Sequence, residues 1–261
     1  MEESQETKKK RLRKVAPEEK LPFTEHLEEF RWRLIIIIIT LSVWFGICYA
    51  YSDNIIKLAQ KPLNQKLIFI SPTEAFFIKL KTSFFVAIFP SLPVILYELG
   101  AFVSPGLHEK EKRYTLPFII SATICFIIGA SFSYFIILPT VTRFLLSFAG
   151  SELKPMISVN NYISFIGKFI IAFGILFEFP VVIFFLSKIG IITPEVLSKN
   201  RRYAILGIFV ISAILTPPDI FIMFLMAIPL IILYEISIII SRLFGKKNVI
   251  TPVSSQLKVE G

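Results

Sequence analysis

Four long apolar runs restrict this chain more than any other feature of its sequence. They are Leu34–Ala50, Ala75–Phe102, Pro117–Leu138 and Tyr162–Leu186. A helix needs about 20 apolar residues to cross the hydrocarbon of a bilayer, and each run approaches or exceeds that length. Only 18% of the residues are charged, and the mean hydropathy is +0.71. The runs and the composition predict an all-α integral membrane protein.

A fifth apolar block, Tyr203–Ile240, is too long for one span and contains the sequence Thr-Pro-Pro-Asp at 216–219. Two adjacent prolines break the hydrogen bonding of a helix, so we expect a tight hairpin of two helices here. The sequence therefore predicts six transmembrane helices, at about 34–50, 75–102, 117–138, 162–186, 203–215 and 220–240.

We expect the last two helices to be short. Residues 203–215 would span about 20 Å as a helix, against a hydrocarbon thickness of about 30 Å. The following helix has an apolar stretch only from Ile220 to Leu233 before Tyr234 and Glu235. Prolines within the spans predict bent helices. The expected shape is a concave helical wall, which suits docking of other helices better than a sealed pore; the prolines are Pro90, Pro93, Pro180 and Pro229.

Lys and Arg predict the orientation, because cytoplasmic segments carry an excess of both. With the N-terminus inside, the inside segments hold 20 of the 28 basic residues and the outside segments hold five. Both termini are therefore expected in the cytoplasm. The predicted division is a basic tail at 1–23, a membrane domain at 24–243 and a second tail at 244–261.

The net charge of +9 follows from this topology and does not indicate nucleic-acid binding. The basic stretch Lys8–Lys14 either lies on anionic membrane lipid or is a disordered tail that orients the chain. Cys48 and Cys125 lie within different spans, so no disulfide framework is expected.

The sequence offers little for catalysis or metal binding. Its two histidines, His26 and His108, fall in cytoplasmic segments, and neither belongs to a zinc-binding motif. Nucleotide-binding loops and nucleophile elbows are also lacking. We therefore expect no enzyme, no cofactor and no metal.

Glu178 is the exceptional residue within the spans. It lies in FGILFEFPVVIFF, well inside the run 162–186. A lone carboxyl in hydrocarbon is costly, so it is expected to be neutral, paired or next to water. Its functional interpretations are a proton relay, a substrate contact or a polar docking point for a partner helix. The structural alternative is a glutamate that is hydrogen-bonded between helices.

Acidic residues also gather at the entrance of the first span. On a helix, Glu25, Glu28 and Glu29 share one face, and Glu28–Arg31 and Glu29–Arg33 are possible ion pairs. A solvated helix with its own salt bridges would explain them.

A second acidic site, with Glu109 and Glu111, follows in the next cytoplasmic loop. Because carboxylates bind guanidinium groups through two hydrogen bonds, two such sites favour an arginine-bearing ligand at the membrane surface.

Seven stretches, in order, resemble the TatC family, the multispan core of the twin-arginine protein translocase, over about residues 22–243. They are HLEEFRWRL, SPTEAFF, FVSPGLHEKEKR, GASFSYFIILP, FGILFEFP, NRRYA and LTPPD. The resemblance implies a receptor for twin-arginine signal peptides on the cytoplasmic face. It places the binding acids at Glu29 and Glu111 and the intramembrane glutamate at Glu178, with other binding residues nearby: Arg31, Phe102, Pro105 and Arg113.

The same resemblance implies partners. The hairpin turn would dock single-span TatA- and TatB-like subunits through Thr216, Pro217, Pro218, Asp219 and Met223. The family often has a polar Ser-Gln pair after this turn, whereas this chain has Ile222 and Met223, which lack the hydrogen-bonding groups of that pair. We also expect a homo-oligomer within a complex, a bacterial inner membrane and, without a nucleotide site, energy from the proton gradient.

Two other interpretations remain at this stage. One is a proton-coupled secondary transporter that uses Glu178, which would need polar groups on several spans. The other is a structural scaffold, which leaves the acidic pairs unexplained.

Overall fold

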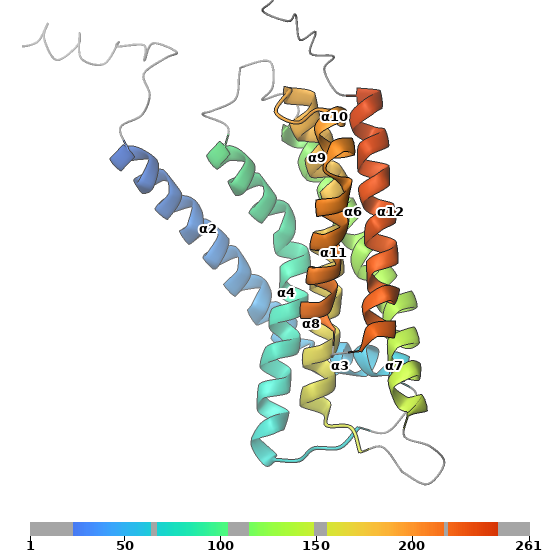
Figure 1. Ribbon diagram of the computed structural model, residues 1–261. Helices are drawn as coiled ribbons and strands as arrows, with labels where there is room; N and C mark the ends of the chain where they lie inside the picture. Colours follow the sequence, from blue (N-terminus) through green and yellow to red (C-terminus); the bar gives the residue numbers. More distant parts are fainter. Residues whose placement is uncertain (1–22, 64–66, 104–114, 149–155, 217–218, 245–261) are drawn as a thin grey trace, which may run out of the picture.

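The computed structural model describes residues 23–63, 67–103, 115–148, 156–216 and 219–244 (Figure 1). Over these residues it contains helices and one isolated bridge between Ile68 and Ser158. The elements are α2 (Phe23–Ala50), α3 (Ser52–Gln60), η2 (Lys61–Leu63), α4 (Pro72–Val103), α6 (Thr115–Phe132), η4 (Ser133–Ile137), α7 (Leu138–Ser147), α8 (Val159–Phe177), α9 (Phe179–Ile189), α10 (Pro194–Lys199), α11 (Arg201–Leu215) and α12 (Ile220–Phe244).

Five helical segments of the described chain are long and apolar enough to cross a membrane, which confirms the all-α membrane class. They cover Leu27–Ala50, Pro72–Phe102, Thr115–Ser147, Val159–Ile189 and Ile220–Phe244. The helix α11 is shorter, with 15 residues.

The expectation that the last two helices are both short is wrong for α12, which has 25 residues. Tyr234 and Glu235 do not end it, because their polar groups find partners on neighbouring elements. The Tyr234 hydroxyl donates to the Leu197 carbonyl at 2.8 Å, and Glu235 pairs with Arg201 at 2.8 Å. Two adjacent polar residues therefore do not mark the end of a helix when neighbouring elements supply their hydrogen-bond and ion-pair partners.

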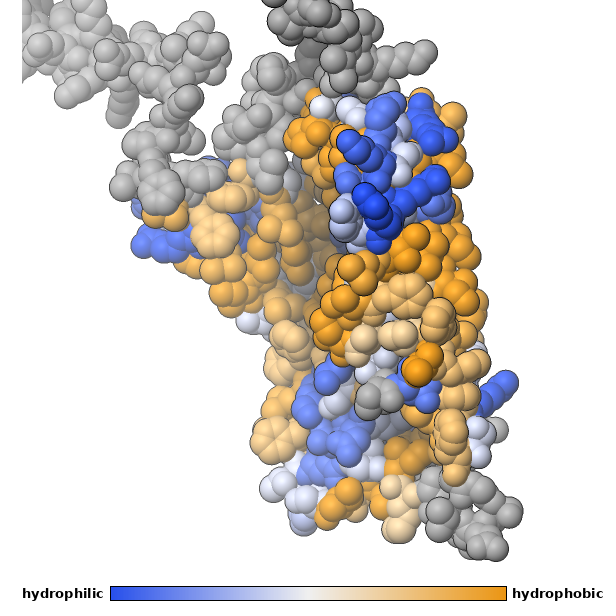
Figure 2. Space-filling model, in the orientation of Figure 1, coloured by the Kyte–Doolittle hydropathy of each residue, from blue (hydrophilic) through white to orange (hydrophobic). Residues whose placement is uncertain are grey.

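The helices form two groups that diverge toward one end of the molecule. Figure 1 shows α2 and the C-terminal half of α4 leaning together away from α9, α11 and α12. Pro90 and Pro93 lie inside α4, and a proline within a helix removes a hydrogen bond and bends the axis. On the face shown in Figure 2, the surface between the two groups is recessed and largely apolar.

Glycines allow α6 and α8 to pack closely at the centre of the bundle. A Cβ atom at Gly129 would lie 2.5 Å from the Phe173 carbonyl oxygen, and one at Gly174 would lie 2.5 Å from the Phe126 ring. Phe126 and Phe173 are fully buried by this contact. Small residues of this kind bring helix backbones together in membranes, where packing replaces the hydrophobic effect.

A buried carboxylate, Glu74, joins the start of α4 to the start of α8. Its Oε2 accepts from the Ile70 N–H at 2.6 Å, and its Oε1 accepts from the Asn160 N–H at 2.9 Å and from the Ser158 hydroxyl. The two N–H groups lie at the starts of α4 and α8, where backbone donors lack carbonyl partners within the helix. The helix dipoles also favour a negative charge at these positions. Glu74 therefore fixes the two entrances relative to each other.

We predict that Gly129→Ala destabilises the fold, because the new Cβ meets backbone and not the end of a flexible side chain. The expected loss is about 1–3 kcal/mol, as for other overpacked cores. The matched control is Gly207→Ala on α11, where a Cβ meets nothing within 4 Å. Thermal unfolding in detergent measures both; equal unfolding temperatures would contradict the packing described here.

Candidate functional site

An arginine between two carboxylates joins α2 to α4 where the two helices lean out together. The Arg33 Nε donates to Glu29 Oε1 at 3.0 Å, one helical turn earlier on α2. Its Nη1 donates to Glu98 Oε2 on α4 at 2.9 Å. The Arg33 side chain is 22% exposed and that of Glu98 is 9% exposed. Because charge-assisted bonds are strongest away from water, this pairing defines the approach of the two helices.

Aromatic rings extend the same contact by one turn. Phe30 of α2 and Phe102 of α4 pack with ring centroids 5.4 Å apart and planes tilted by 59°. Leu27, Phe30 and Trp32 nevertheless stay exposed. The site therefore combines a carboxylate, a guanidinium and an accessible aromatic surface.

The structure brings together only part of the predicted binding set. Glu29 and Phe102 lie at this contact between α2 and α4. Arg31 faces away from it, 3.9 Å from Glu28, and both side chains are 66% exposed. The expected Glu29–Arg33 and Glu28–Arg31 pairs are thus both present. Pro105, Glu111 and Arg113 lie outside the described residues.

Sequence reasoning missed the role of Glu98. A signal was available, because Glu98 is a carboxyl at the inner end of an apolar run, and such a group needs a partner. Its partner was not predictable from spacing, since Arg33 lies 65 residues earlier in the chain.

Glu178 lies at a break between α8 and α9. Its N–H donates to the Ile175 carbonyl at 3.1 Å, and its own carbonyl accepts from Val181 at 2.9 Å. Pro180 occupies the first turn of α9, which explains why the helix restarts here. The carboxyl is partly buried, and no hydrogen bond or ion pair reaches it from the described residues. A glutamate hydrogen-bonded between helices is therefore not what this part of the chain shows.

The turn before α12 uses its polar side chains for capping. Asp219 accepts from the Ile222 N–H at 3.0 Å, and the Thr216 hydroxyl donates to the Ser212 carbonyl at 2.8 Å. Ile222 is fully buried, and Met223 is partly exposed. Pro217 and Pro218 lie outside the described residues. The polar groups described at this turn thus stabilise the ends of α11 and α12.

Among the described residues, no cluster of three or more His, Cys, Asp or Glu side chains is arranged to hold a metal ion. The chemistry available at the α2–α4 contact is binding of a cation by carboxylates, supported by aromatic surface.

Comparisons with known proteins agree over most of the chain. A family model described as Sec-independent protein translocase protein (TatC) matches residues 25–229. A protein of that name from Desulforapulum autotrophicum is 45% identical over 237 residues, which cover 88% of each chain. Another from Aquifex aeolicus is 43% identical over 235 residues, or 87% of this chain and 98% of the relative.

Solved structures agree as well. A crystal structure described as the twin arginine translocase receptor TatC aligns with a TM-score of 0.75 and 43% identity, covering 84% of this chain and 98% of the other. A second, of the same receptor in the detergent DDM, aligns with a TM-score of 0.76 and 42% identity over 83% of this chain and 99% of the other.

We predict that Arg33→Gln loosens the contact between α2 and α4, because Glu98 is left buried without its cation. Breaking a buried pair costs about 3–5 kcal/mol, and we expect the low end because Arg33 keeps 22% exposure. The control, Arg31→Gln, removes an exposed pair and should leave stability unchanged.

Two readouts measure this effect in nanodiscs: thermal unfolding, and the distance between spin labels at the exposed positions Leu27 and Leu99. Arg33→Gln should lower the unfolding temperature and broaden the distance distribution. An unchanged distribution would show that other contacts hold the two helices together.

Proposed function

This chain belongs to the TatC family, and on that premise we propose that it is the receptor and core subunit of a twin-arginine protein translocase. Family membership makes it a multi-pass membrane component of the Sec-independent protein translocase, and the family is not one of enzymes. The proposed receptor binds twin-arginine signal peptides of folded proteins on the cytoplasmic face.

The observation that carries the proposal is the pairing of Glu29 and Glu98 with one guanidinium. The chain's own Arg33 demonstrates that the geometry at this contact suits arginine. A signal-peptide arginine would compete with Arg33 for Glu29, while Glu98 keeps Arg33 neutralised. Charge-assisted bonds of this kind contribute about 1.5–3 kcal/mol each.

The second proposed acid, Glu111, lies outside the described residues, in the segment that joins Val103 at the end of α4 to Thr115 at the start of α6. An extended chain of eight residues from Val103 reaches at most about 28 Å, so the sequence separation permits Glu111 to meet a ligand bound at Glu29. In the proposed joint site, each arginine of the pair meets one carboxylate.

We further propose that the apolar segment of the signal peptide lies along the recessed face between the two helix groups, toward Glu178. Burial of apolar side chains contributes about 25 cal/mol per Å². Glu178 would then be the polar contact at depth, which agrees with a carboxyl that receives no hydrogen bond from the described residues.

The complete assembly needs further subunits. In our proposal α11 is the sixth span, both termini are cytoplasmic, and the membrane is a bacterial inner membrane. The hairpin of α11 and α12 recruits TatA- and TatB-like single-span proteins, several copies of the chain join one complex, and the proton gradient drives export.

The proton-coupled transporter is not favoured. Family membership argues against it, and two lysines of α4 already have partners. Lys79 pairs with Asp53 at 2.8 Å, and Lys81 donates to Asn160 at 2.7 Å. Among the described residues, no hydrogen bond or ion pair links Glu178 to another charged group.

We predict that the chain in nanodiscs binds a paired-arginine signal peptide about ten-fold more tightly than its paired-lysine twin. Lysine keeps the charge but loses the bidentate fork, and ten-fold corresponds to about 1.4 kcal/mol. Combining Glu29→Gln with Glu111→Gln should remove the preference, whereas Glu28→Gln, at an exposed position, should retain it. Fluorescence anisotropy at two salt concentrations measures the affinity of both peptides for the wild type and for each variant. Equal binding of both peptides, weakening together with salt, would indicate a nonspecific acidic surface.

A second variant separates the receptor from the transporter. Glu178→Gln keeps the shape of the side chain and removes its charge, so the arginine preference should survive. Proton flux into proteoliposomes is measured for the wild type and for Glu178→Gln. A flux that is present in the wild type and lost in the variant, with peptide binding unaffected, would support the transporter.

A further inference from the structure

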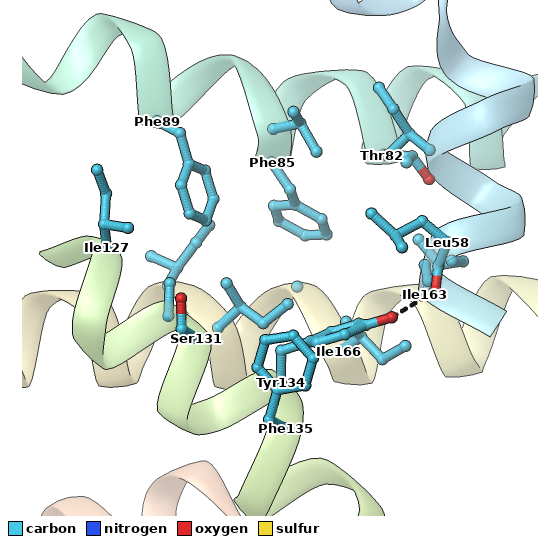
Figure 3. Close-up of a pocket in the computed structure, with 17 residues that line it drawn as sticks. Leu58, Thr82, Phe85, Phe89, Ile127, Ser131, Tyr134, Phe135, Ile163 and Ile166 are labelled. Atoms are coloured by element: carbon cyan, nitrogen blue, oxygen red, sulfur yellow. Dashed lines mark hydrogen bonds between the residues drawn. The ribbon is translucent and has the colours of Figure 1, made fainter. Parts of the chain in front are cut away.

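A cavity of about 460 Å³ lies next to α3, between α4, the junction of α6 and η4, and α8 (Figure 3). Its walls are almost entirely aliphatic and aromatic, and none of the described residues that line it is charged. Leu58 of α3, Phe89 of α4 and Ile127 of α6 mark its extent. Its volume is within the range of about 300–1,000 Å³ that small-molecule sites occupy.

The cavity lies at the depth of lipid chains. The helix at one end of the cavity, α3, is amphipathic: its Ile55 and Ala59 line the cavity, while its Lys57 is exposed, as is Lys61 in the following η2. Such a helix lies in the membrane interface with its basic residues toward the headgroups. The cavity runs from Thr82 to Phe89 along α4, about 10 Å at 1.5 Å per residue, and so fits within one leaflet of a core about 30 Å thick.

The rim of the cavity faces outward. Leu58, Ile127 and Phe135 line it, and they are 51%, 49% and 71% exposed. In a membrane-spanning chain these side chains meet lipid tails, so a chain can enter sideways from the bilayer without crossing a polar barrier.

A buried hydroxyl in the wall of this apolar space has no hydrogen-bond partner among the described residues. Thr82 is 4% exposed, and its hydroxyl oxygen makes no hydrogen bond with any described residue. On the same helix, Ser83 donates to the Lys79 carbonyl at 2.6 Å and Ser91 to the Ala87 carbonyl at 2.7 Å. Figure 3 shows the Thr82 oxygen beside Leu58, at the α3 end of the cavity. A buried hydroxyl left in this way has the capacity to donate to an acceptor from outside the chain.

We propose that an acyl chain of a phospholipid, from the leaflet on the α3 side, occupies this cavity. Its ester carbonyl accepts a hydrogen bond from the Thr82 hydroxyl, and its phosphate lies near the exposed Lys57 and Lys61. The chain then runs from Thr82 toward Phe89, along the apolar walls. The proposal depends on the membrane placement of α3 and not on signal-peptide binding.

The unpaired hydroxyl favours a lipid chain over a helix. A helix uses its own carbonyls for internal hydrogen bonds, so it offers Thr82 few acceptors, whereas a phospholipid carries free ester carbonyls.

The test compares two phospholipids that differ only in the presence of ester carbonyls. Delipidated chain in detergent is titrated with a diester phosphatidylglycerol and with its diether analogue, and native mass spectrometry measures the bound fraction. The wild type should prefer the diester by about three- to ten-fold, the effect of one hydrogen bond. Thr82→Val should bind both lipids equally, and the control Thr140→Val, which replaces an exposed hydroxyl that already donates to Ile136, should keep the preference.

The ratio compares two lipids on one variant, so it does not depend on how much protein is folded. A second variant, Ser131→Leu, fills the cavity from α6 and should reduce binding of both lipids. An equal diester preference in wild type and Thr82→Val would overturn the proposal. A second result would also overturn it. If an apolar signal-peptide segment displaced both lipids, and Ser131→Leu weakened binding of that segment, the cavity would be a site for the peptide.

Discussion

The bilayer supplies no water to a charged side chain, and this constraint explains most of the polar contacts in the structure. Each such group needs a partner within the protein. Arg33 is held between Glu29 and Glu98, and Lys79 is paired with Asp53. These contacts join α2 to α4 at one end of the helices and α3 to α4 at the other. Polar pairs therefore fix how α2 and α3 meet α4, whereas close packing at glycines sets the approach of α6 and α8.

The same constraint separates structural acids from candidate functional ones. Glu74 is satisfied by donors from two helix entrances, so its role is to fix them. Glu29 is shared with an arginine at an accessible, aromatic contact, where a second arginine can compete. Glu178 lies at a helix break without a hydrogen bond from the described residues. A receptor needs acids in the situations of Glu29 and Glu178, because its acids must exchange partners when a peptide binds.

Much of this arrangement was predictable from sequence. Apolar length predicted the long helices, and one-turn spacing predicted the Glu29–Arg33 pair. The length of α12 was misjudged, because Arg201 and Leu197 satisfy its polar residues through contacts between separate elements. The Arg33–Glu98 pair, the π-helical turn at Ser133–Ile137 and the cavity next to α3 depend on tertiary packing in the same way. Local periodicity carries no information about such partners.

The central claim is that Glu29 exchanges its internal arginine for an arginine of the signal peptide. The most direct measurement is an electron cryomicroscopy structure of the chain in nanodiscs, with an antibody fragment to add mass and a bound twin-arginine peptide. Our account predicts a peptide guanidinium within about 3 Å of the Glu29 carboxylate, with Arg33 retained by Glu98. A bound peptide whose arginines lie elsewhere, with the Glu29–Arg33 pair intact, would contradict it.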